Sequence, residues 1–265
     1  MSTDQIKRNP LPEGFVPNKA LGQNFLSNVS IIEAILEAAQ IDGARVLEIG
    51  PGTGALTEGL LSRAGWLAAV EKDGRLCELL SSRFQEKLTL LHADALDADI
   101  PALMGESPWH AVGNLPYYAT TPIVLRLLSL LPESMTLMVQ KEAADRFFAG
   151  AKDRVYGPVA VLCGCFYTAK IVVNAPRDSF SPPPEVDSVV VRLARNARQA
   201  VDGIAFLSFC KQAFSMRRKT LYNNLNKEPR VLSALSSLGF PEDARAEALP
   251  PEALLAIFLA INDMV

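Results

Sequence analysis

The sequence predicts an α/β protein in which a Rossmann-like, doubly wound sheet of seven strands is followed by a small domain made only of helices. Two observations support this prediction. Short apolar runs alternate with helical patterns over the first 195 residues, and only helical patterns follow. With 265 residues, 49% of them hydrophobic, the chain is long enough to bury one substantial core and a smaller one.

Seven short apolar runs have the length of buried strands. Between the earlier runs, apolar residues recur at helical spacing, and Asn28 or Ser30 can cap the first helix. This alternation is typical of a largely parallel sheet with ligand sites at the carboxyl ends of its strands. The predicted strands are 45–49, 66–70, 88–92, 109–112, 135–139, 167–173 and 186–193, and the predicted helices are 30–40, 54–63, 74–84 and 122–131.

After residue 195 the helical patterns have no strand pattern between them. Polar residues over 194–202 indicate an exposed linker. We therefore expect a flexible leader over 1–18, the α/β domain over 19–195 and a small helical domain over 196–265. The predicted C-terminal helices are 201–220, 229–238 and 251–261.

Composition limits the classes of protein. The formal net charge of -3 argues against general attraction to nucleic acid, so any RNA-binding surface must be a local patch. No apolar run is long enough to span a membrane, and the first residues lack a signal-peptide pattern. The four cysteines lack zinc-ligand spacing and His92 and His110 fall in predicted strands, so we expect free thiols and structural histidines. We expect a monomeric, cytoplasmic protein without a metal.

A glycine-rich turn follows the first predicted strand, in the sequence Glu-Ile-Gly-Pro-Gly-Thr-Gly at 48–54. Glycines at Gly50 and Gly52 allow backbone N–H groups to approach a ligand closely. Glu71 ends the next strand, where a carboxylate can accept both ribose hydroxyls, and Asp94 ends the third, where it can accept an adenine amino group. Together with Ala55, these glycines also match a dinucleotide-binding pattern, which leaves an NAD-linked oxidoreductase open.

Asn114, Leu115, Pro116 and Tyr117 follow the fourth predicted strand. The lone pair of an adenine amino nitrogen is delocalised into the ring, so methylation requires acceptors that hold the amine and make it more tetrahedral. The Asn114 side chain supplies one acceptor, and Pro116 favours an extended Leu115 whose carbonyl can supply another. Tyr117 can stack on the base. This combination predicts methyl transfer to a base nitrogen, driven by positioning rather than by a general base.

Five segments resemble the KsgA/RsmA family of ribosomal RNA adenine dimethyltransferases, from about residue 19 to the C-terminal helices. The resemblance implies a class I methyltransferase that uses S-adenosyl-L-methionine to dimethylate the N6 atoms of two adjacent adenosines near the 3′ end of 16S rRNA, during small-subunit assembly. Domain 19–195 would bind the cofactor and catalyse, and domain 196–265 would dock on the RNA. The segments are Leu-Gly-Gln-Asn-Phe-Leu at 21–26, the glycine turn with its continuation at 48–57, Asn-Leu-Pro-Tyr at 114–117, Gln-Lys-Glu at 140–142 and Phe-Ser-Pro-Pro-Pro-Glu-Val-Asp-Ser at 180–188.

The resemblance also implies roles for single residues. Gln23 and Asn24 would flank the methionine moiety of the cofactor, and Tyr117 and Phe180 would sandwich the target ring, with stacking offsetting part of the cost of flipping the base out. The catalytic candidates are Asn114, Leu115, Tyr117 and Phe180. The cofactor-binding candidates are Gln23, Asn24, Leu26, Gly50, Gly52, Glu71, Lys72, Asp94, Ala95 and Asn114.

A basic cluster lies near the end of the predicted helix 201–220, formed by Lys211, Arg217, Arg218 and Lys219. It lacks interleaved acids, so we expect it to contact RNA phosphates, although a merely solvated helix face remains the alternative. The loop around 146–156, which includes Arg154 and Tyr156, would add a second contact.

Other functions stay open at this stage. An antibiotic-resistance enzyme that methylates adenine N6 of 23S rRNA has the same fold, but the 180–188 loop resembles the small-subunit group more closely. A DNA adenine methyltransferase, an NAD-linked oxidoreductase and an assembly factor that only binds the subunit are further alternatives. The sequence determines neither the target nucleotides nor the order of methyl additions.

Overall fold

The computed structural model describes residues 11, 14–18, 21–196 and 201–262, so most of the predicted leader and part of the predicted linker lie outside the described residues. The chain forms two compact units. The first takes its described residues from Met1–Ile123, Pro132–Ala144 and Lys170–Ala194, and the second from Val124–Leu131, Asp145–Ala169 and Arg195–Val265.

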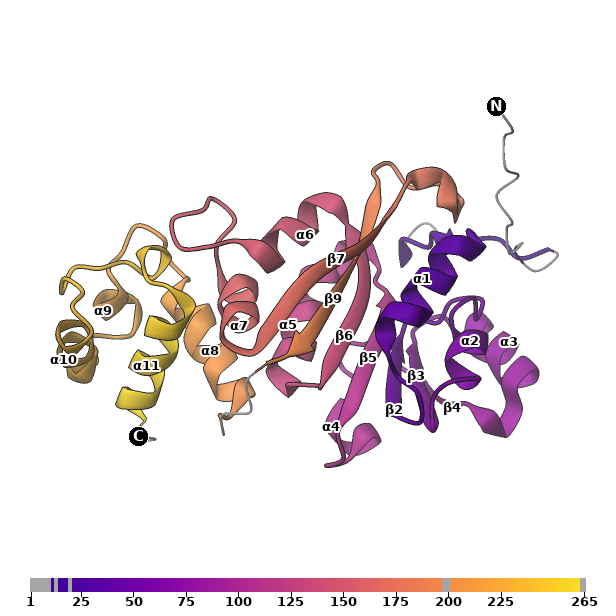
Figure 1. Ribbon diagram of the computed structural model, residues 1–265, viewed down its shortest axis with the longest axis horizontal. Helices are drawn as coiled ribbons and strands as arrows, with labels where there is room; N and C mark the ends of the chain where they lie inside the picture. The colour runs from indigo at the N-terminus through magenta and orange to yellow at the C-terminus, as the bar shows by residue number, and fades with distance from the viewer. Residues whose placement is uncertain (1–10, 12–13, 19–20, 197–200, 263–265) are drawn as a thin grey trace. The chain divides into compact units, whose positions relative to one another are not determined.

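A seven-stranded sheet is the frame of the first unit, as predicted (Figure 1). The strand order is β4-β3-β2-β5-β6-β9-β7. The pairs β4/β3, β3/β2, β2/β5 and β5/β6 are parallel, whereas β6 and β9 are antiparallel. The strands are β2 (Arg45–Ile49), β3 (Trp66–Glu71), β4 (Thr89–His92), β5 (Trp109–Asn114), β6 (Ser134–Gln140), β7 (Tyr167–Ala175) and β9 (Ser188–Arg195).

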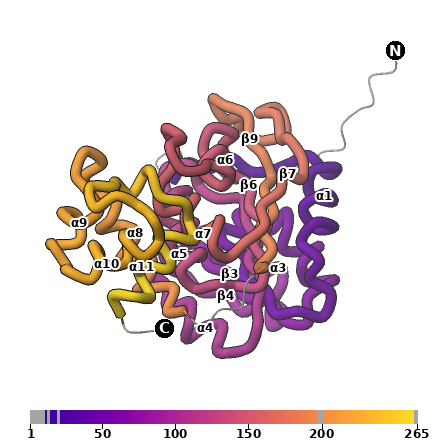
Figure 2. The backbone as a smooth tube through the Cα atoms, turned by 60° about the vertical axis from the view of Figure 1, so that its left-hand side comes forward, coloured from indigo at the N-terminus to yellow at the C-terminus, as the bar shows by residue number. Residues whose placement is uncertain are grey.

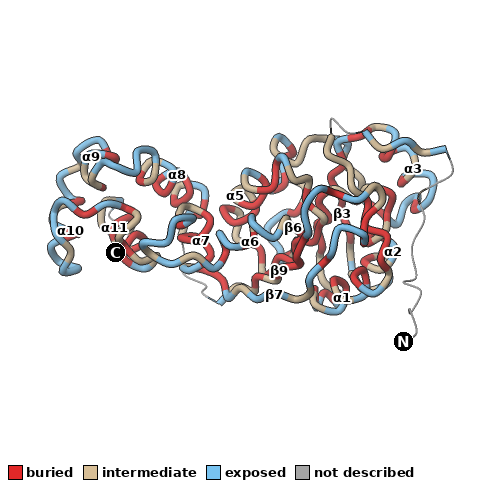
Figure 3. Tube along the Cα trace, turned by 90° about the horizontal axis from the view of Figure 1, so that it is seen from above, coloured by how far each residue is buried: buried red, intermediate tan, exposed pale blue. Residues whose placement is uncertain are grey.

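The central strands are buried on both faces, which is why they read in the sequence as continuous apolar runs. Val46 and Leu47 are consecutive residues of β2 on opposite faces, and both are 0% exposed. Figure 3 shows buried backbone along β3, β6 and β9. Because β2, β3, β4, β5 and β6 run parallel, their carboxyl ends meet at one edge of the sheet.

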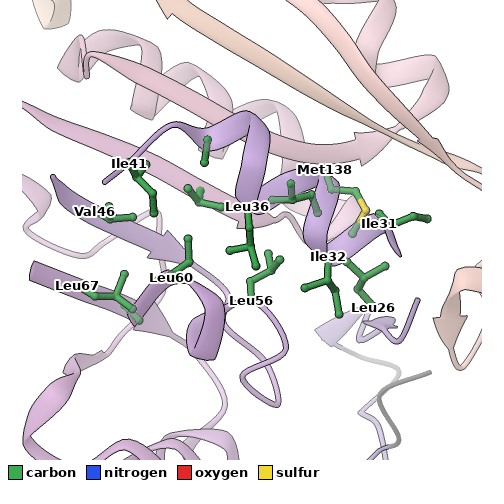
Figure 4. Close-up of a cluster of buried hydrophobic side chains, with 14 of the residues drawn as sticks. Leu26, Ile31, Ile32, Leu36, Ile41, Val46, Leu56, Leu60, Leu67 and Met138 are labelled. Atoms are coloured by element: carbon green, nitrogen blue, oxygen red, sulfur yellow. The ribbon is translucent and has the colours of Figure 1, made fainter. Parts of the chain in front are cut away.

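Helix α1 (Val29–Ala39) covers one face of this sheet. Asn28 caps it, because the Asn28 side chain accepts a hydrogen bond from the backbone N–H of Ser30. Figure 4 shows Ile32 and Leu36 of α1 packed with Leu56 and Leu60 in one hydrophobic cluster. The other helices before residue 150 are α2 (Thr57–Leu61), α3 (Gly74–Phe84), α4 (Ile100–Met104), α5 (Thr120–Leu130) and α6 (Lys141–Phe148).

A two-stranded antiparallel sheet joins two segments that are far apart in the sequence. Strand β1 (Phe25–Leu26) pairs with β8 (Phe180–Ser181), with Leu26 opposite Phe180. The Ser179 carbonyl accepts hydrogen bonds from the backbone N–H groups of Ser27 and Asn28 at 2.9 and 3.3 Å. The segment before α1 is therefore tied to the loop before β9.

The second unit has an aromatic core. Phe206 packs edge-on against Phe166 and Phe258 and lies parallel to Phe209. A Cβ added at Gly164 would lie 2.6 Å from Cγ of Pro251, so glycine permits the close packing of two helices. Figure 2 shows α7, α8 and α11 side by side. The helices are α7 (Pro158–Phe166), α8 (Gly203–Ala213), α9 (Leu221–Asn224), α10 (Pro229–Ser237) and α11 (Pro251–Ile261).

The prediction of one long helix over 201–220 is wrong. Helix α8 ends at Ala213, and residues 214–219 form turns before α9. The side chain of Asn224, 7% exposed, explains the break: its Nδ2 donates to the carbonyls of Ala213 at 2.7 Å and Met216 at 3.1 Å. These two bonds satisfy carbonyls that a continued helix would have used.

Replacing Asn224 with Ala should lower the free energy of unfolding by about 1–3 kcal/mol, because the buried carbonyl of Ala213 loses its side-chain donor, whereas the Met216 carbonyl retains the N–H of Lys219. Urea denaturation of the full chain measures the change. Asn223→Ala is the matched control, since that exposed neighbour bonds only to Thr220 among the described residues. Equal losses for the two variants would contradict this account of the helix end.

Candidate active site

A pocket opens in the first unit at the carboxyl ends of β2, β3, β4 and β5. It holds about 770 Å³ of space, including open solvent at its mouth. The segment before β1 forms another wall. Of the predicted site residues, Gln23, Asn24, Gly50, Gly52, Glu71, Lys72, Asp94, Ala95, Asn114, Leu115 and Tyr117 line the pocket, and Leu26 and Phe180 do not.

The glycine turn after β2 forms the floor of the pocket. Gly50 and Gly52 have φ angles of +66° and +59°, in the left-handed region that side chains disfavour. A Cβ at Gly52 would lie 3.0 Å from the Phe25 ring, and a Cβ at Gly50 would lie 3.6 Å from the Asn114 carbonyl oxygen. Glycine is favoured at both positions by the backbone conformation, and at Gly52 also by the close approach of the Phe25 ring.

Glu71, at the end of β3, is held by the backbone around the turn. Its carboxylate accepts hydrogen bonds from the N–H groups of Gly52 at 3.1 Å, Lys72 at 2.9 Å and Asp73 at 2.9 Å. Only 7% of Glu71 is exposed, and burial raises the pKa of its carboxyl despite these three bonds. The carboxylate is thus fixed in direction and retains acceptor capacity towards the pocket.

Glu48 is a second buried acid, to which the sequence analysis assigned no role. It is 1% exposed, and Oγ1 of Thr57 donates to its carboxylate at 2.7 Å. Burial, with a smaller contribution from Glu71, raises the pKa of Glu48 to about 8. An acid at the second-to-last position of an apolar strand, just before a glycine turn, was the signal that could have identified it.

Lys72 and Asp94 form an ion pair at the rim of the pocket. Nζ of Lys72 donates to Oδ2 of Asp94 at 2.7 Å, and Oδ1 of Asp94 accepts from the N–H of Leu96 at 2.9 Å. The Lys72 and Asp94 side chains are 46% and 24% exposed, so water reaches both. Ala95 lies next to them in the wall.

Gln23 is fixed at both ends of its amide. Its Nε2 donates to Oδ2 of Asp73 at 2.8 Å, and its Oε1 accepts from the N–H of Asn18 at 2.7 Å. Asp73 also caps α3 and pairs with Arg75; the bonds from Arg75 and Gln23 lower the pKa of Asp73 to about 2. The segment that carries Gln23 is therefore anchored to the start of α3.

Asn114, the last residue of β5, is oriented by the same segment. Its Nδ2 donates to the main-chain carbonyl of Asn24 at 3.1 Å. Among the described residues, no donor bonds to Oδ1 of Asn114 or to the carbonyl of Leu115, whereas the next carbonyl, of Pro116, accepts from Ala119 and Thr120. The pocket wall thus offers two acceptors at consecutive residues.

Tyr117 and Tyr118 come next, in a short 3-10 helix over Tyr117–Ala119. The Tyr117 hydroxyl forms a hydrogen bond of 2.7 Å with Oγ of Ser188, the first residue of β9. Tyr118 is 57% exposed, and its ring lies against Gly22. Both tyrosines line the pocket, although the sequence analysis assigned a role only to Tyr117.

Leu26 and Phe180 lie in the hydrophobic cluster below the pocket. They are 4% and 2% exposed, and they face each other across the β1/β8 pair. The structure therefore gives the pocket one tyrosine face from Tyr117 and none from Phe180. The predicted stacking of Phe180 on a target ring stays a prediction. It requires the Phe180 side chain to leave the hydrophobic cluster.

In the second unit, Lys211 of the predicted basic cluster lies on α8, whereas Arg217, Arg218 and Lys219 lie in the turns that follow this helix. Lys211, Arg218 and Lys219 are exposed and make no ion pair among the described residues, whereas Arg217 bonds to Glu247 and to the Arg154 carbonyl. Arg217 thereby joins the turn over 214–219 to the loop before α7. The predicted contact through Tyr156 is wrong, because Tyr156 is 2% exposed and donates to the Leu249 carbonyl.

The histidines and cysteines make structural contacts. His110 bonds to Ser134 and His92 bonds to the Lys72 carbonyl. All four cysteines are free, and three of them are buried. Within the described ranges, no group of three His, Cys, Asp or Glu side chains is placed to hold a metal ion, and no helix has the length and apolar character needed to cross a membrane.

The fold and pocket define the class of protein. A mostly parallel seven-stranded sheet with one antiparallel strand near its edge, and a glycine-turn pocket at the carboxyl ends, is the architecture of a class I methyltransferase. The chain belongs to the ribosomal RNA adenine dimethylase family, whose model matches residues 14–263. The resemblance found in the sequence is confirmed.

Relatives with known names agree with this membership. The chain is 38% identical over 257 residues to a ribosomal RNA small subunit methyltransferase A from Geobacillus thermodenitrificans, covering 89% of this chain and 88% of the relative. It is 40% identical over 249 residues to one from Clostridium botulinum, covering 89% and 90%.

Solved structures are similar over most of the chain. A dimethyladenosine transferase from Plasmodium falciparum has a TM-score of 0.74 and 27% identity, covering 90% of this chain and 98% of that chain. The 23S rRNA methyltransferase ErmE has a TM-score of 0.62 and 28% identity, covering 90% and 100%.

Stability should fall as pH rises through the neutral range. The pKa of Glu48 is about 8 in the folded protein, and its ordinary value, which applies to the unfolded chain, is 4.5. At a pH between these two values the folded chain therefore binds one more proton than the unfolded chain. Glu48→Gln should flatten this part of the pH dependence and stabilise the protein most at pH 8. Urea denaturation from pH 5 to pH 8 measures the change. Glu37→Gln, an exposed acid on α1, is the control, and an unchanged slope in Glu48→Gln would contradict the burial argument.

Proposed function

We propose that this chain uses S-adenosyl-L-methionine to dimethylate the N6 atoms of two adjacent adenosines near the 3′ end of 16S rRNA, during assembly of the small ribosomal subunit. One observation carries the proposal. The Oδ1 atom of Asn114 and the carbonyl of Leu115 lie in the wall of the pocket beside the glycine turn, and no described donor bonds to either oxygen. Family membership and the names of the relatives support the choice of substrate.

The pocket residues fit the cofactor. Gly50 and Gly52 line the pocket, and without a side chain they let a ligand approach the backbone of the turn closely. The Glu71 carboxylate, held by three N–H groups, keeps acceptor capacity on Oε2 for a ribose hydroxyl. Asp94 and Ala95 would lie beside the adenine, and Gln23 and Asn24 beside the methionine moiety. When bound, the cofactor supplies a sulfonium methyl group to an attacking nitrogen.

The residues of the chain would act by holding the amine. Oδ1 of Asn114 and the Leu115 carbonyl accept its two hydrogens and favour a tetrahedral nitrogen whose lone pair is free to attack. Tyr117 supports the ring by stacking, and the Tyr117–Ser188 bond keeps the tyrosine ring in place. As the new N–C bond forms and the methyl–sulfur bond breaks, the nitrogen would lose a proton, which has become acidic and can pass to water. Alignment of the amine with the methyl group would be the main source of the rate acceleration.

The basic cluster of the second unit would bind RNA phosphates. Lys211, Arg218 and Lys219 extend into solvent without a described acidic partner, so phosphate contact would cost no existing ion pair. Arg217 differs, because its guanidinium already bonds to Glu247. We therefore assign Arg217 mainly to shaping the turn that presents Arg218 and Lys219.

A 23S rRNA methyltransferase is the nearest alternative, since ErmE has the same fold at 28% identity. The relatives named for the small subunit are 38–40% identical over nearly the whole chain, which favours the 16S substrate. Mapping methylated adenines in both rRNAs of a strain that lacks this chain tests the choice. Loss of methylation on 16S rRNA alone is the expected outcome, and a loss confined to 23S rRNA would refute the proposal.

Asn114→Ala should reduce methyl transfer by about 100-fold or more, because one of two acceptors that align the amine is lost. The dissociation constant for S-adenosylhomocysteine should change little. Turnover on unmethylated small subunits, together with calorimetric titration of the cofactor product, separates the two effects. Asn174→Ala, an exposed asparagine of β7, serves as control. Turnover of Asn114→Ala within a fewfold of wild type would rule out the assigned role.

Replacing both Arg218 and Lys219 with Ala should weaken RNA binding and reduce the slope of log affinity against log salt by about 2, since each phosphate contact contributes about 1. Filter binding to small-subunit rRNA at several salt concentrations measures this slope. As a control, Arg230 is replaced with Ala. This exposed cation of α10 bonds to Glu228, so its loss should leave the slope nearly unchanged. A double variant with the wild-type slope would show that the cluster is only a solvated surface.

A further inference from the structure

Tyr118 lines the pocket and still lacks a role. It is 57% exposed, which is a high value for a large aromatic side chain. Its position is nevertheless defined: the ring lies against Gly22, where an added Cβ would be 3.3 Å from Cδ1 of Tyr118. The ring therefore connects the end of β5 with the segment before β1.

The two consecutive tyrosines face opposite sides of the site. Tyr117 reaches Ser188 at the start of β9, whereas Tyr118 lies near Lys72, which follows β3. In the strand order, β3 and β9 stand on opposite sides of β5. Tyr117 thus faces the side proposed for the target base, and Tyr118 faces the side proposed for the adenosine end of the cofactor.

Three side chains that line the pocket on that side are linked to one another. Nζ of Lys72 lies 6.0 Å from the centroid of the Tyr118 ring and donates to Oδ2 of Asp94 at 2.7 Å. Lys72 follows β3, Asp94 follows β4 and Tyr118 follows β5. Exposed cation–π contacts and exposed ion pairs are weak, because water competes for the same groups. Such a closure can open without disturbing the fold.

The proposed reaction requires repeated exchange of the cofactor. Each N6 atom receives two methyl groups, and each methyl consumes one S-adenosyl-L-methionine, so S-adenosylhomocysteine must leave between the two transfers. If the cofactor product leaves by a route that avoids the target side, the target adenosine of the RNA can stay in place between the two transfers. Release of product through a mobile closure often limits turnover in enzymes.

We propose that Tyr118, with Lys72 and Asp94, gates the adenosine side of the cofactor pocket and sets the rate at which cofactor and product exchange. This inference rests on the proposed function. A gate differs from an ordinary binding contact in its kinetics: removing a gate accelerates entry and exit together, whereas removing a contact accelerates exit alone.

Tyr118→Ala should raise both the association and the dissociation rate constants of S-adenosylhomocysteine by roughly tenfold, while the dissociation constant changes less than about threefold. Stopped-flow measurements on the full-length chain give both rate constants. Phe148→Ala removes another exposed aromatic ring, at the end of α6 and outside the pocket lining, and should leave both rates at wild-type values. A melting temperature close to wild type for Tyr118→Ala verifies that the variant is folded.

Unchanged rates in Tyr118→Ala would overturn the gate, and so would a rise in the dissociation rate alone, which would make Tyr118 a simple contact. Wild-type protein that binds neither S-adenosyl-L-methionine nor its product would instead refute the proposed function. The two failures are therefore distinguishable in one set of measurements.

Discussion

The hydrogen bond from Nδ2 of Asn114 to the main-chain carbonyl of Asn24 is the constraint on which the site depends. An asparagine amide can present either end, and this bond assigns the donor end to Asn24, which leaves Oδ1 as an acceptor. The carbonyl of Asn24 is itself held in place, because Gln23 is anchored to Asp73 and the following strand β1 pairs with β8. The proposed chemistry therefore relies on a segment outside the main sheet to orient a residue at the end of β5.

Around this constraint the first unit concentrates features that cost stability. Two carboxyls, of Glu48 and Glu71, are almost fully buried, and two glycines adopt left-handed conformations within five residues of Glu48. Burial of a carboxyl is offset only in part by the hydrogen bonds it receives, as the raised pKa values of both acids indicate. Such features persist where the surrounding packing enforces them. Here the buried hydrophobic cluster that includes one face of α1 supplies this packing.

The sequence allowed prediction of the elements whose hydrophobic pattern is unambiguous. The strand at 45–49 and the helix at 74–84 have the predicted bounds, because the strand is buried on both faces and Asp73 caps the helix. The α7 helix was missed, since six of its nine residues are buried, five of them consecutive, and little helical periodicity remains. The end of α8 was missed for another reason: it depends on Asn224, which follows eleven residues after Ala213, and no local pattern reveals that contact. The burial of Phe180 is likewise a long-range effect, set by pairing with β1.

The divergence of the two tyrosines shows how local geometry separates two tasks at one strand end. A 3-10 helix has three residues per turn, so consecutive side chains point about 120° apart. Pro116 precedes this turn in an extended conformation with φ of −63°, and its carbonyl is used to hold Ala119 and Thr120. The turn is thus defined before either tyrosine contacts anything distant. Because of it, one tyrosine can support a target base while its neighbour closes the opposite side of the pocket, and neither needs to move for the other to act.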